Sequence, residues 1–83
     1  MEEEKIRSEI KKIYGKDIIV LDIEKRLMPA KYNESNKVKR DAFYMYDVTI
    51  SIAGNPPIVV TIKESSKVKE DIDEFLKAHK INL

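Results

Sequence analysis

Residues 44–52 read YMYDVTISI, which is the strongest β-strand pattern in the chain. Large apolar side chains occupy the even positions from 44 to 52, whereas Asp, Thr and Ser occupy positions 47, 49 and 51. Because successive side chains of a β-strand point to opposite faces of a sheet, this period of two predicts a strand with one buried and one exposed face. We place that strand at residues 41–53.

Two further strands are predicted, one on either side of this segment. Residues 17–27 are rich in Ile, Val and Leu and end before Pro29, which cannot donate a hydrogen bond to a sheet. Residues 58–63 alternate again, and only the turn sequence GNPP separates them from the central strand. So short a link predicts an antiparallel hairpin. The segment 30–40 is long for such a connection, so it either is a mobile loop or extends the flanking strands.

Helices are predicted at both ends of the chain. Residues 2–14 and 67–80 carry apolar side chains three or four positions apart on otherwise charged segments. Acidic residues lie near the start of each segment and lysines near its end, which suits the helix dipole. Gly15 can leave the first helix with a positive φ, and Ser65 or Ser66 can cap the second.

The order α-β-β-β-α predicts one α+β domain over residues 1–83, a three-stranded antiparallel meander sheet with two helices packed on one face. The side chains expected to form the core are Ile19, Leu21, Ile23, Tyr46, Val48, Ile50, Ile52, Val60 and Ile62 from the strands, and Ile6, Ile10, Ile13, Val68, Ile72, Phe75 and Leu76 from the helices. Tyr14 and Tyr44 are expected at the edge of that core.

The apolar side chains expected on the opposite, open face are Ile18, Val20, Phe43, Met45 and Val59. An exposed apolar patch of this kind usually marks a contact surface.

Charges are balanced overall but not along the chain. Sixteen Lys and Arg stand against fifteen Asp and Glu, a net charge of +1. Between residues 25 and 40 there are six cations and one acid, a local charge of +5 that leaves −4 for the rest. The six cations are Lys25, Arg26, Lys31, Lys37, Lys39 and Arg40. They can keep a hairpin loop soluble, contact nucleic-acid phosphates while Tyr32 stacks on a base, or meet an acidic protein surface.

Residues suited to catalysis or metal binding are few. His79 is the only histidine and there is no cysteine, so neither a nucleophilic triad nor a zinc site is predicted. Asp22 and Glu24 share one side of a strand, where we expect solvent-facing carboxylates rather than an acid–base pair. With only two glycines, no phosphate-binding loop is predicted. We therefore predict no enzymatic activity, no cofactor, no metal and no small-molecule substrate.

The expected location is the cytoplasm. The absence of cysteine suits a reducing compartment, and the acidic segment Glu2–Glu4 is unlike the basic start of a secretion signal. No apolar run approaches the ~20 residues of a membrane span, so no membrane association is expected.

The segment Ser65-Ser66-Lys67-Val68-Lys69, at the start of the second predicted helix, resembles the lysine-bearing helix start of double-stranded RNA-binding domains. That family shares the element order α-β-β-β-α. The resemblance implies that Lys67 and Lys69 contact phosphates. Four acids on the same helix depart from the pattern and would repel a nucleic-acid backbone, namely Glu70, Asp71, Asp73 and Glu74. The chain is therefore not assigned to that family.

These features predict a small interaction domain that binds a protein partner, or a second copy of itself, through the open sheet face and the basic hairpin loop. The expected partner-binding residues are Lys25, Arg26, Lys31, Tyr32, Lys37, Lys39, Arg40, Phe43 and Met45. Phe43 and Met45 are expected to be apolar anchors, while Lys37, Lys39 and Arg40 steer the partner. The alternative is a domain that binds RNA or DNA.

Overall fold

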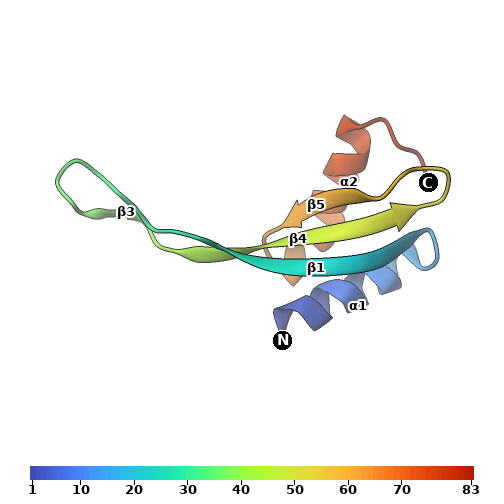
Figure 1. Cartoon of the computed structure of the whole chain (residues 1–83), viewed down its shortest axis with the longest axis horizontal. Helices are drawn as coiled ribbons and strands as arrows, with labels where there is room; N and C mark the ends of the chain where they lie inside the picture. Colours follow the sequence, from blue (N-terminus) through green and yellow to red (C-terminus); the bar gives the residue numbers. More distant parts are fainter.

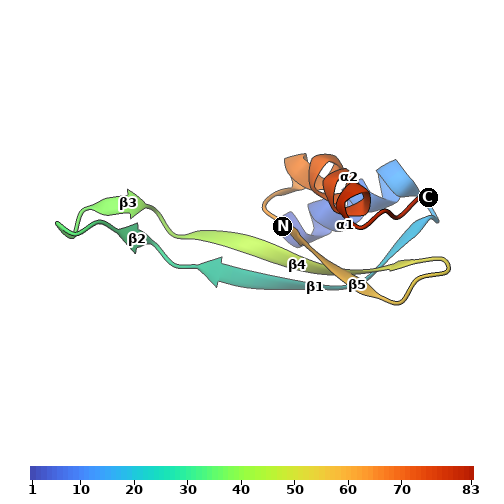
Figure 2. The same cartoon turned by 90° about the horizontal axis from the view of Figure 1, so that it is seen from above.

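The computed structural model describes residues 1–83. Its elements are α1 (Glu2–Tyr14), β1 (Ile18–Met28), β2 (Lys31–Tyr32), β3 (Val38–Arg40), β4 (Phe43–Ile52), β5 (Ile58–Ile62), a 3-10 turn η1 (Ser65–Lys67) and α2 (Val68–Ala78). The predicted α+β fold is confirmed: β1, β4 and β5 form an antiparallel sheet in that order, and both helices lie on one face of it (Figures 1 and 2). Neither helix has the length and apolar composition to cross a membrane.

α1 forms over the predicted residues, and Gly15 ends it with φ 58°. The start of α2 differs from the prediction. Ser65 and Ser66 make no side-chain cap and instead belong to η1. The Ser65 backbone N–H donates a hydrogen bond of 2.5 Å to Glu2 Oε1. A carboxylate of the first helix therefore caps η1, the turn that leads into α2.

The core lies between the sheet and the two helices. Its fully or almost fully buried side chains are Ile6, Ile10, Ile18, Tyr46, Val48, Ile50, Ile52, Val60, Ile62, Val68, Ile72 and Leu76. Every second residue of β4 from Tyr46 to Ile52 belongs to it, as the alternation in residues 44–52 predicts. Ile13, Ile23 and Phe75 are half-buried against this core.

A β-bulge interrupts the pairing of β1 with β4. Val20 pairs with Ile50 and Asp22 pairs with Thr49, so Leu21 is an extra residue without a partner on β4. One inserted residue moves every later side chain of the strand to the other face.

The bulge reverses the predicted orientation of the first half of β1. Ile18 is 2% exposed and packs under the helices, whereas Ile19 is 56% exposed. Val20 packs against the core, and Leu21 is exposed. The predictions that Ile19 and Leu21 are core residues, and that Ile18 and Val20 lie on the open face, are therefore wrong. Residues 18–21 are all apolar, so their sequence does not indicate where the side chains change from one face to the other. Beyond the bulge, Ile23 faces the core as predicted.

β1 and β4 continue beyond β5 as a two-stranded ribbon. β5 pairs with β4 only between Tyr46 and Ile50, but β1 follows β4 out to the pair Met28–Phe43, and β2 and β3 prolong the ribbon. We call residues 25–45 the arm. It extends away from both helices (Figures 1 and 2) and gives the molecule extents of 50 × 28 × 19 Å. The radius of gyration is 14.9 Å, compared with about 12 Å for a compact chain of this length.

The tip of the arm is an ordered turn. Asn33 Oδ1 accepts hydrogen bonds of 3.0 Å from the backbone N–H groups of Ser35 and Lys37. Asn36 adopts a positive φ of 58°, which Asn tolerates better than most residues. The segment 30–40 therefore extends the flanking strands, which is the second of its two predicted alternatives.

Candidate interaction surface

The arm has two faces, which we define by cross-strand pairs, since paired residues of an antiparallel ribbon share a face. Tyr46 of β4 is buried under the helices, so residues of the same parity form the inner arm face. The inner arm face carries Lys25 and the pair Leu27–Tyr44, and the outer arm face carries the pairs Arg26–Met45 and Met28–Phe43. Lys25 and Arg26, adjacent in sequence, therefore point to opposite sides.

An aromatic ring in contact with two cations marks the outer arm face. The guanidinium carbon of Arg40 lies 4.7 Å from the centroid of the Phe43 ring, and Lys63 Nζ lies 5.2 Å from it. Arg40 Nη2 also donates a hydrogen bond of 2.9 Å to the carbonyl oxygen of Pro29. Arg40 Nε is buried and has no hydrogen-bond partner. Cation–π contacts of this kind hold the side chains against the ribbon while leaving the charges near the surface.

The inner arm face is apolar and uncovered. Leu27 is 55% exposed and Tyr44 is 48% exposed, and Lys25 Nζ lies 4.0 Å from the centroid of the Tyr44 ring. Tyr44 was expected at the edge of the core. It lies outside the core because β5 and both helices end before they reach this level of the ribbon.

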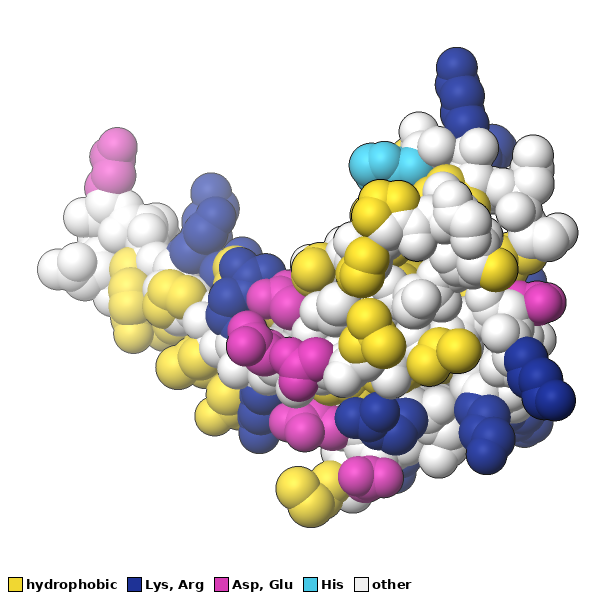
Figure 3. All heavy atoms as spheres, turned by 45° about the vertical axis from the view of Figure 1, so that its right-hand side comes forward, with side chains coloured by type: hydrophobic (Ala, Val, Ile, Leu, Met, Phe, Trp, Pro, Cys, Tyr) yellow, Lys and Arg dark blue, Asp and Glu magenta, His cyan; other side chains and the backbone are white.

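The tip adds a second pair of exposed apolar side chains. Tyr32 pairs with Val38, and both are more than half exposed. Lys37 and Lys39 lie on either side of Val38 and are exposed, and none of these lysines forms an ion pair. Figure 3 shows apolar side chains gathered along the arm next to Lys and Arg side chains.

Arg26 has a partner within the sheet. Its Nε lies 3.1 Å from Asp47 Oδ2, and its Nη2 donates a hydrogen bond of 3.1 Å to Asp47 Oδ1. The hydroxyl of Thr61 donates to the same oxygen at 3.0 Å. Because this network joins β1, β4 and β5, Arg26 connects the base of the arm to the three-stranded sheet.

The open face of the sheet is accordingly polar in its middle. Asp22 and Glu24 are exposed there, as predicted, beside the network of Arg26 with Asp47. The predicted apolar patch is therefore not continuous. Ile19, Leu21 and Val59 are exposed at one end, and the outer arm face carries the other apolar side chains of this surface.

The nine predicted partner-binding residues thus fall into three groups, all on or at the base of the arm. The structure brings Arg26, Arg40, Phe43 and Met45 to the outer arm face, puts Lys25 on the inner arm face, and places Lys31, Tyr32, Lys37 and Lys39 at the tip. Sequence reasoning missed Leu27, Met28, Val38, Tyr44 and Lys63 as members of this surface. One signal could have found them: the third strand was predicted to be about half as long as the other two, so it could not cover their far ends.

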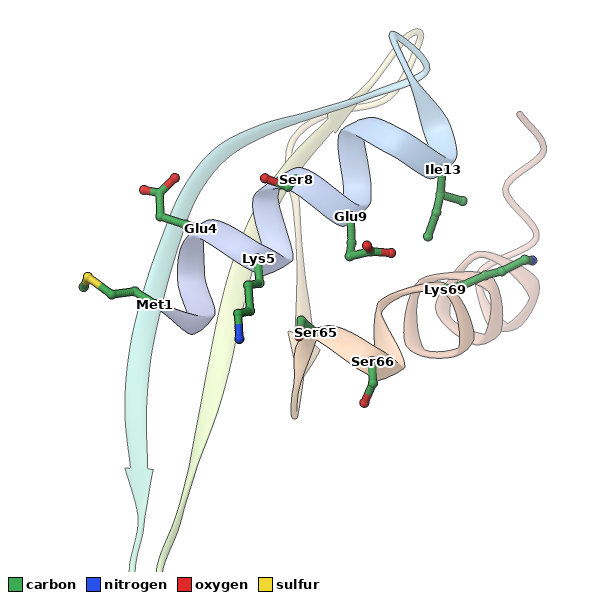
Figure 4. Close-up of a pocket in the computed structure, with 9 residues that line it drawn as sticks. All are labelled: Met1, Glu4, Lys5, Ser8, Glu9, Ile13, Ser65, Ser66 and Lys69. Atoms are coloured by element: carbon green, nitrogen blue, oxygen red, sulfur yellow. The ribbon is translucent and has the colours of Figure 1, made fainter.

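A groove of about 480 Å³ lies between α1 and the start of α2. Figure 4 shows Lys5, Glu9 and Ile13 extending from α1 toward α2, whereas Glu4 points away. Its charged lining residues form no ion pair with one another: they are Glu4, Lys5, Glu9 and Lys69. No group of His, Asp or Glu side chains in the chain is arranged to hold a metal ion.

One cluster of titratable side chains joins the two helices. The Tyr14 hydroxyl donates a hydrogen bond of 2.7 Å to Asp73 Oδ1, and Lys69 Nζ donates one of 2.5 Å to Asp73 Oδ2. Burial, together with the bond to Asp73, raises the pKa of Tyr14 above its usual 10.0. The hydrogen bonds from Lys69 and Tyr14 lower the pKa of Asp73 below 3.8. All three groups have partners within the cluster, which serves to fasten α1 to α2.

Comparison of the chain with protein-family models, with curated proteins and with solved structures found no match.

Proposed function

We propose that this chain is a non-enzymatic interaction domain and that the arm is its contact surface for an acidic protein partner. The observation that carries the proposal is the uncovered two-stranded ribbon. An isolated two-stranded ribbon is marginally stable in water, and this one exposes large apolar side chains at Leu27, Tyr44, Tyr32 and Val38. A partner that covers these apolar side chains would remove them from water and so stabilise the arm.

The charges of the arm favour an acidic partner. Lys25, Lys31, Lys37 and Lys39 have no acidic partner in the structure, and Arg40 bonds only to a backbone carbonyl. Charges at the rim of a contact raise the rate of association and select the partner, while buried aromatic and aliphatic anchors supply most of the affinity. Phe43, Met45 and Met28 would be the anchors on the outer arm face, and the free edges of the ribbon could pair with an extended segment of the partner.

Affinity capture with matched variants tests this proposal. The native chain, Phe43→Lys and Leu21→Lys are each immobilised and exposed to nuclease-treated extract of the native host, and the retained proteins are identified by mass spectrometry. Leu21 is the control because it is an exposed apolar residue of the same sheet that lies outside the arm. We expect a protein that the native chain and Leu21→Lys retain and Phe43→Lys loses.

Leu27→Lys, on the inner arm face, provides a second variant that leaves the Phe43 cluster intact. It reports whether the partner also covers the inner arm face. If all four baits retain the same proteins in the same amounts, the arm is not the contact surface.

A second candidate function is nucleic-acid binding, and the shape of the arm favours it. A two-stranded ribbon fits the major groove of DNA, and five cations without acidic partners lie on this ribbon, namely Lys25, Lys31, Lys37, Lys39 and Arg40. Arg26, Lys67 and Lys69, by contrast, are engaged in ion pairs with Asp47, Glu70 and Asp73. Affinity for RNA or DNA would fall at least about tenfold between low and moderate salt. If no binding is measurable at low ionic strength, this candidate is excluded.

A further inference from the structure

Both edges of the three-stranded sheet are free. β1 and β5 each pair with β4 on one side and have no strand on the other. Such an edge presents unpaired backbone N–H and C=O groups that can accept another strand. Figure 1 shows α1 beside the β1 edge and α2 beside the β5 edge, so each free strand is accompanied by a helix. A groove runs between strand and helix on each side.

The groove between α1 and β1 is apolar with a basic rim. Its volume is about 350 Å³, and Ile18 and Ile19 are among the apolar side chains that line it. The charged residues of its lining are Arg7, Lys11 and Lys16, with no acid among them. None of these three cations forms an ion pair.

The groove between α2 and β5 has the opposite charge. Its volume is about 360 Å³, with Val59 and Phe75 among its apolar lining residues. Its charged residues are Asp71 and Glu74, with no cation among the lining. Neither carboxylate forms an ion pair, although other acids of α2 do. The two edges of one sheet are therefore complementary in charge and alike in their apolar floors.

We propose that copies of this chain associate head to tail, with the α2/β5 groove of one copy seated against the α1/β1 groove of the next. β1 and β5 are both antiparallel to β4, so they run in the same direction, and this contact would continue the sheet from copy to copy by parallel pairing. The contact places Asp71 and Glu74 opposite Arg7, Lys11 and Lys16. It uses surfaces outside the arm and does not depend on the function proposed above.

The charges also select against the alternative arrangement. A two-fold symmetric contact would place each groove against its own copy. Lys11 would then meet Lys11, or Glu74 would meet Glu74, and like charges brought together across an interface oppose association. Only the head-to-tail arrangement sets the two acids of one groove against the three cations of the other.

The test reverses the charge of each groove in turn. In Arg7→Glu/Lys11→Glu both grooves are acidic, and in Asp71→Lys/Glu74→Lys both are basic, so neither variant can associate with itself. An equal mixture restores complementarity at every contact. Sedimentation velocity of the full chain over a range of concentrations, at one ionic strength, measures the result. Variants serve better than a salt titration, because salt screens the groove attraction and also the repulsion between the basic arms of neighbouring copies.

We expect the native chain to associate increasingly with concentration, each double variant to lose association by at least about tenfold, and their mixture to regain it. The control, Lys5→Glu/Lys12→Glu, changes the net charge equally at exposed positions of α1 outside the α1/β1 groove and should associate as the native chain does. Circular dichroism checks that every variant is folded.

Three results would overturn the proposal: a native chain that stays monomeric throughout, a mixture that does not associate, or a control that loses association with the others. Phe43→Lys separates the two proposals. If this variant abolishes self-association while the groove variants retain it, copies meet through the arm and the edge contact is excluded.

Discussion

Glu2 and Ser65 are 63 positions apart in the chain, yet Glu2 Oε1 accepts a hydrogen bond of 2.5 Å from the Ser65 backbone N–H. No side chain near the start of η1 or α2 caps those elements. Because the first N–H groups of a helical segment lack partners within it, a carboxylate supplied from elsewhere can satisfy one of them. The first turn of α1 therefore stabilises η1, the turn that leads into the last helix.

Removing this carboxylate should weaken the whole domain. We expect Glu2→Ala to lower the free energy of unfolding by about 1 kcal/mol, which is typical for the loss of a helix cap. Glu4→Ala, in the same turn of α1 but with no hydrogen bond to η1, should change it by less than about 0.5 kcal/mol. Urea unfolding of the two variants measures the difference, and equal losses would mean that the bond to Ser65 contributes nothing.

The same bond predicts sensitivity to acid. The hydrogen bonds from Ser65 lower the pKa of Glu2 in the folded chain below its usual 4.5. As the pH falls, the Glu2 carboxylate of the unfolded chain is protonated near pH 4.5, whereas that of the folded chain stays ionised to a lower pH. The stabilisation that Glu2 gives above pH 4.5 is therefore lost as the pH falls through the pKa of the folded chain. Glu2→Gln should show a shallower loss of stability between about pH 5 and about pH 2 than the native chain. Unfolding curves with the same slope would contradict this.

The raised pKa of Tyr14 predicts a loss of stability at alkaline pH. Its pKa is raised in the folded chain, so the stabilisation is complete below the unfolded value of 10.0 and is lost as the pH rises beyond it. Tyr14→Phe removes the hydrogen bond to Asp73 and should flatten the alkaline limb of the stability curve. Tyr32→Phe is the control, because Tyr32 lies at the tip of the arm and makes no side-chain hydrogen bond. Thermal unfolding between about pH 8 and about pH 11 measures both, and identical curves for the two variants would exclude the role of Tyr14.

Two adjacent residues of β1 test the bulge at Leu21. Ile18 is buried under the helices, and Ile19 is 56% exposed. We expect Ile18→Ala to cost about 2–5 kcal/mol, as is usual for a large core residue, and Ile19→Ala to cost less than about 1 kcal/mol. Chemical denaturation of each variant gives these values. If Ile19→Ala costs more than Ile18→Ala, Ile19 is the buried residue, β1 alternates without interruption, and there is no bulge at Leu21.

The arm should open more readily than the body of the sheet. Backbone amides bonded between β1 and β4 near Leu27 and Tyr44 belong to a two-stranded ribbon, whereas those near Val48 lie in a three-stranded sheet under two helices. Hydrogen exchange followed by nuclear magnetic resonance should be at least about tenfold faster in the arm. Uniform protection along β4 would show that the arm is as stable as the body without a partner.

Much of this architecture could be predicted from the chain alone. The alternation in residues 44–52 identified β4 and its buried face, because a strand with one face in water has to alternate. The apolar stripe with Ile6 and Ile10 identified α1, and Gly15 marked its end. The cations of residues 25–40 marked the arm as a candidate contact surface, because their excess is local and visible without coordinates.

Tertiary contacts decided the rest. In residues 18–21 both faces of β1 are apolar, so only the fit of its side chains under α1 could select which face is buried and where the bulge falls. Leu27 and Tyr44 follow the same pattern as core residues, yet they are exposed because β5 stops at the level of Tyr46. The charged residues of the two grooves belong to α1, to the turn after it and to α2, whereas Ile19 and Val59 of their apolar linings belong to β1 and β5. The grooves therefore exist only where helix and strand lie side by side. Periodicity reports which residues share a side of one element, but burial depends on what the neighbouring elements cover.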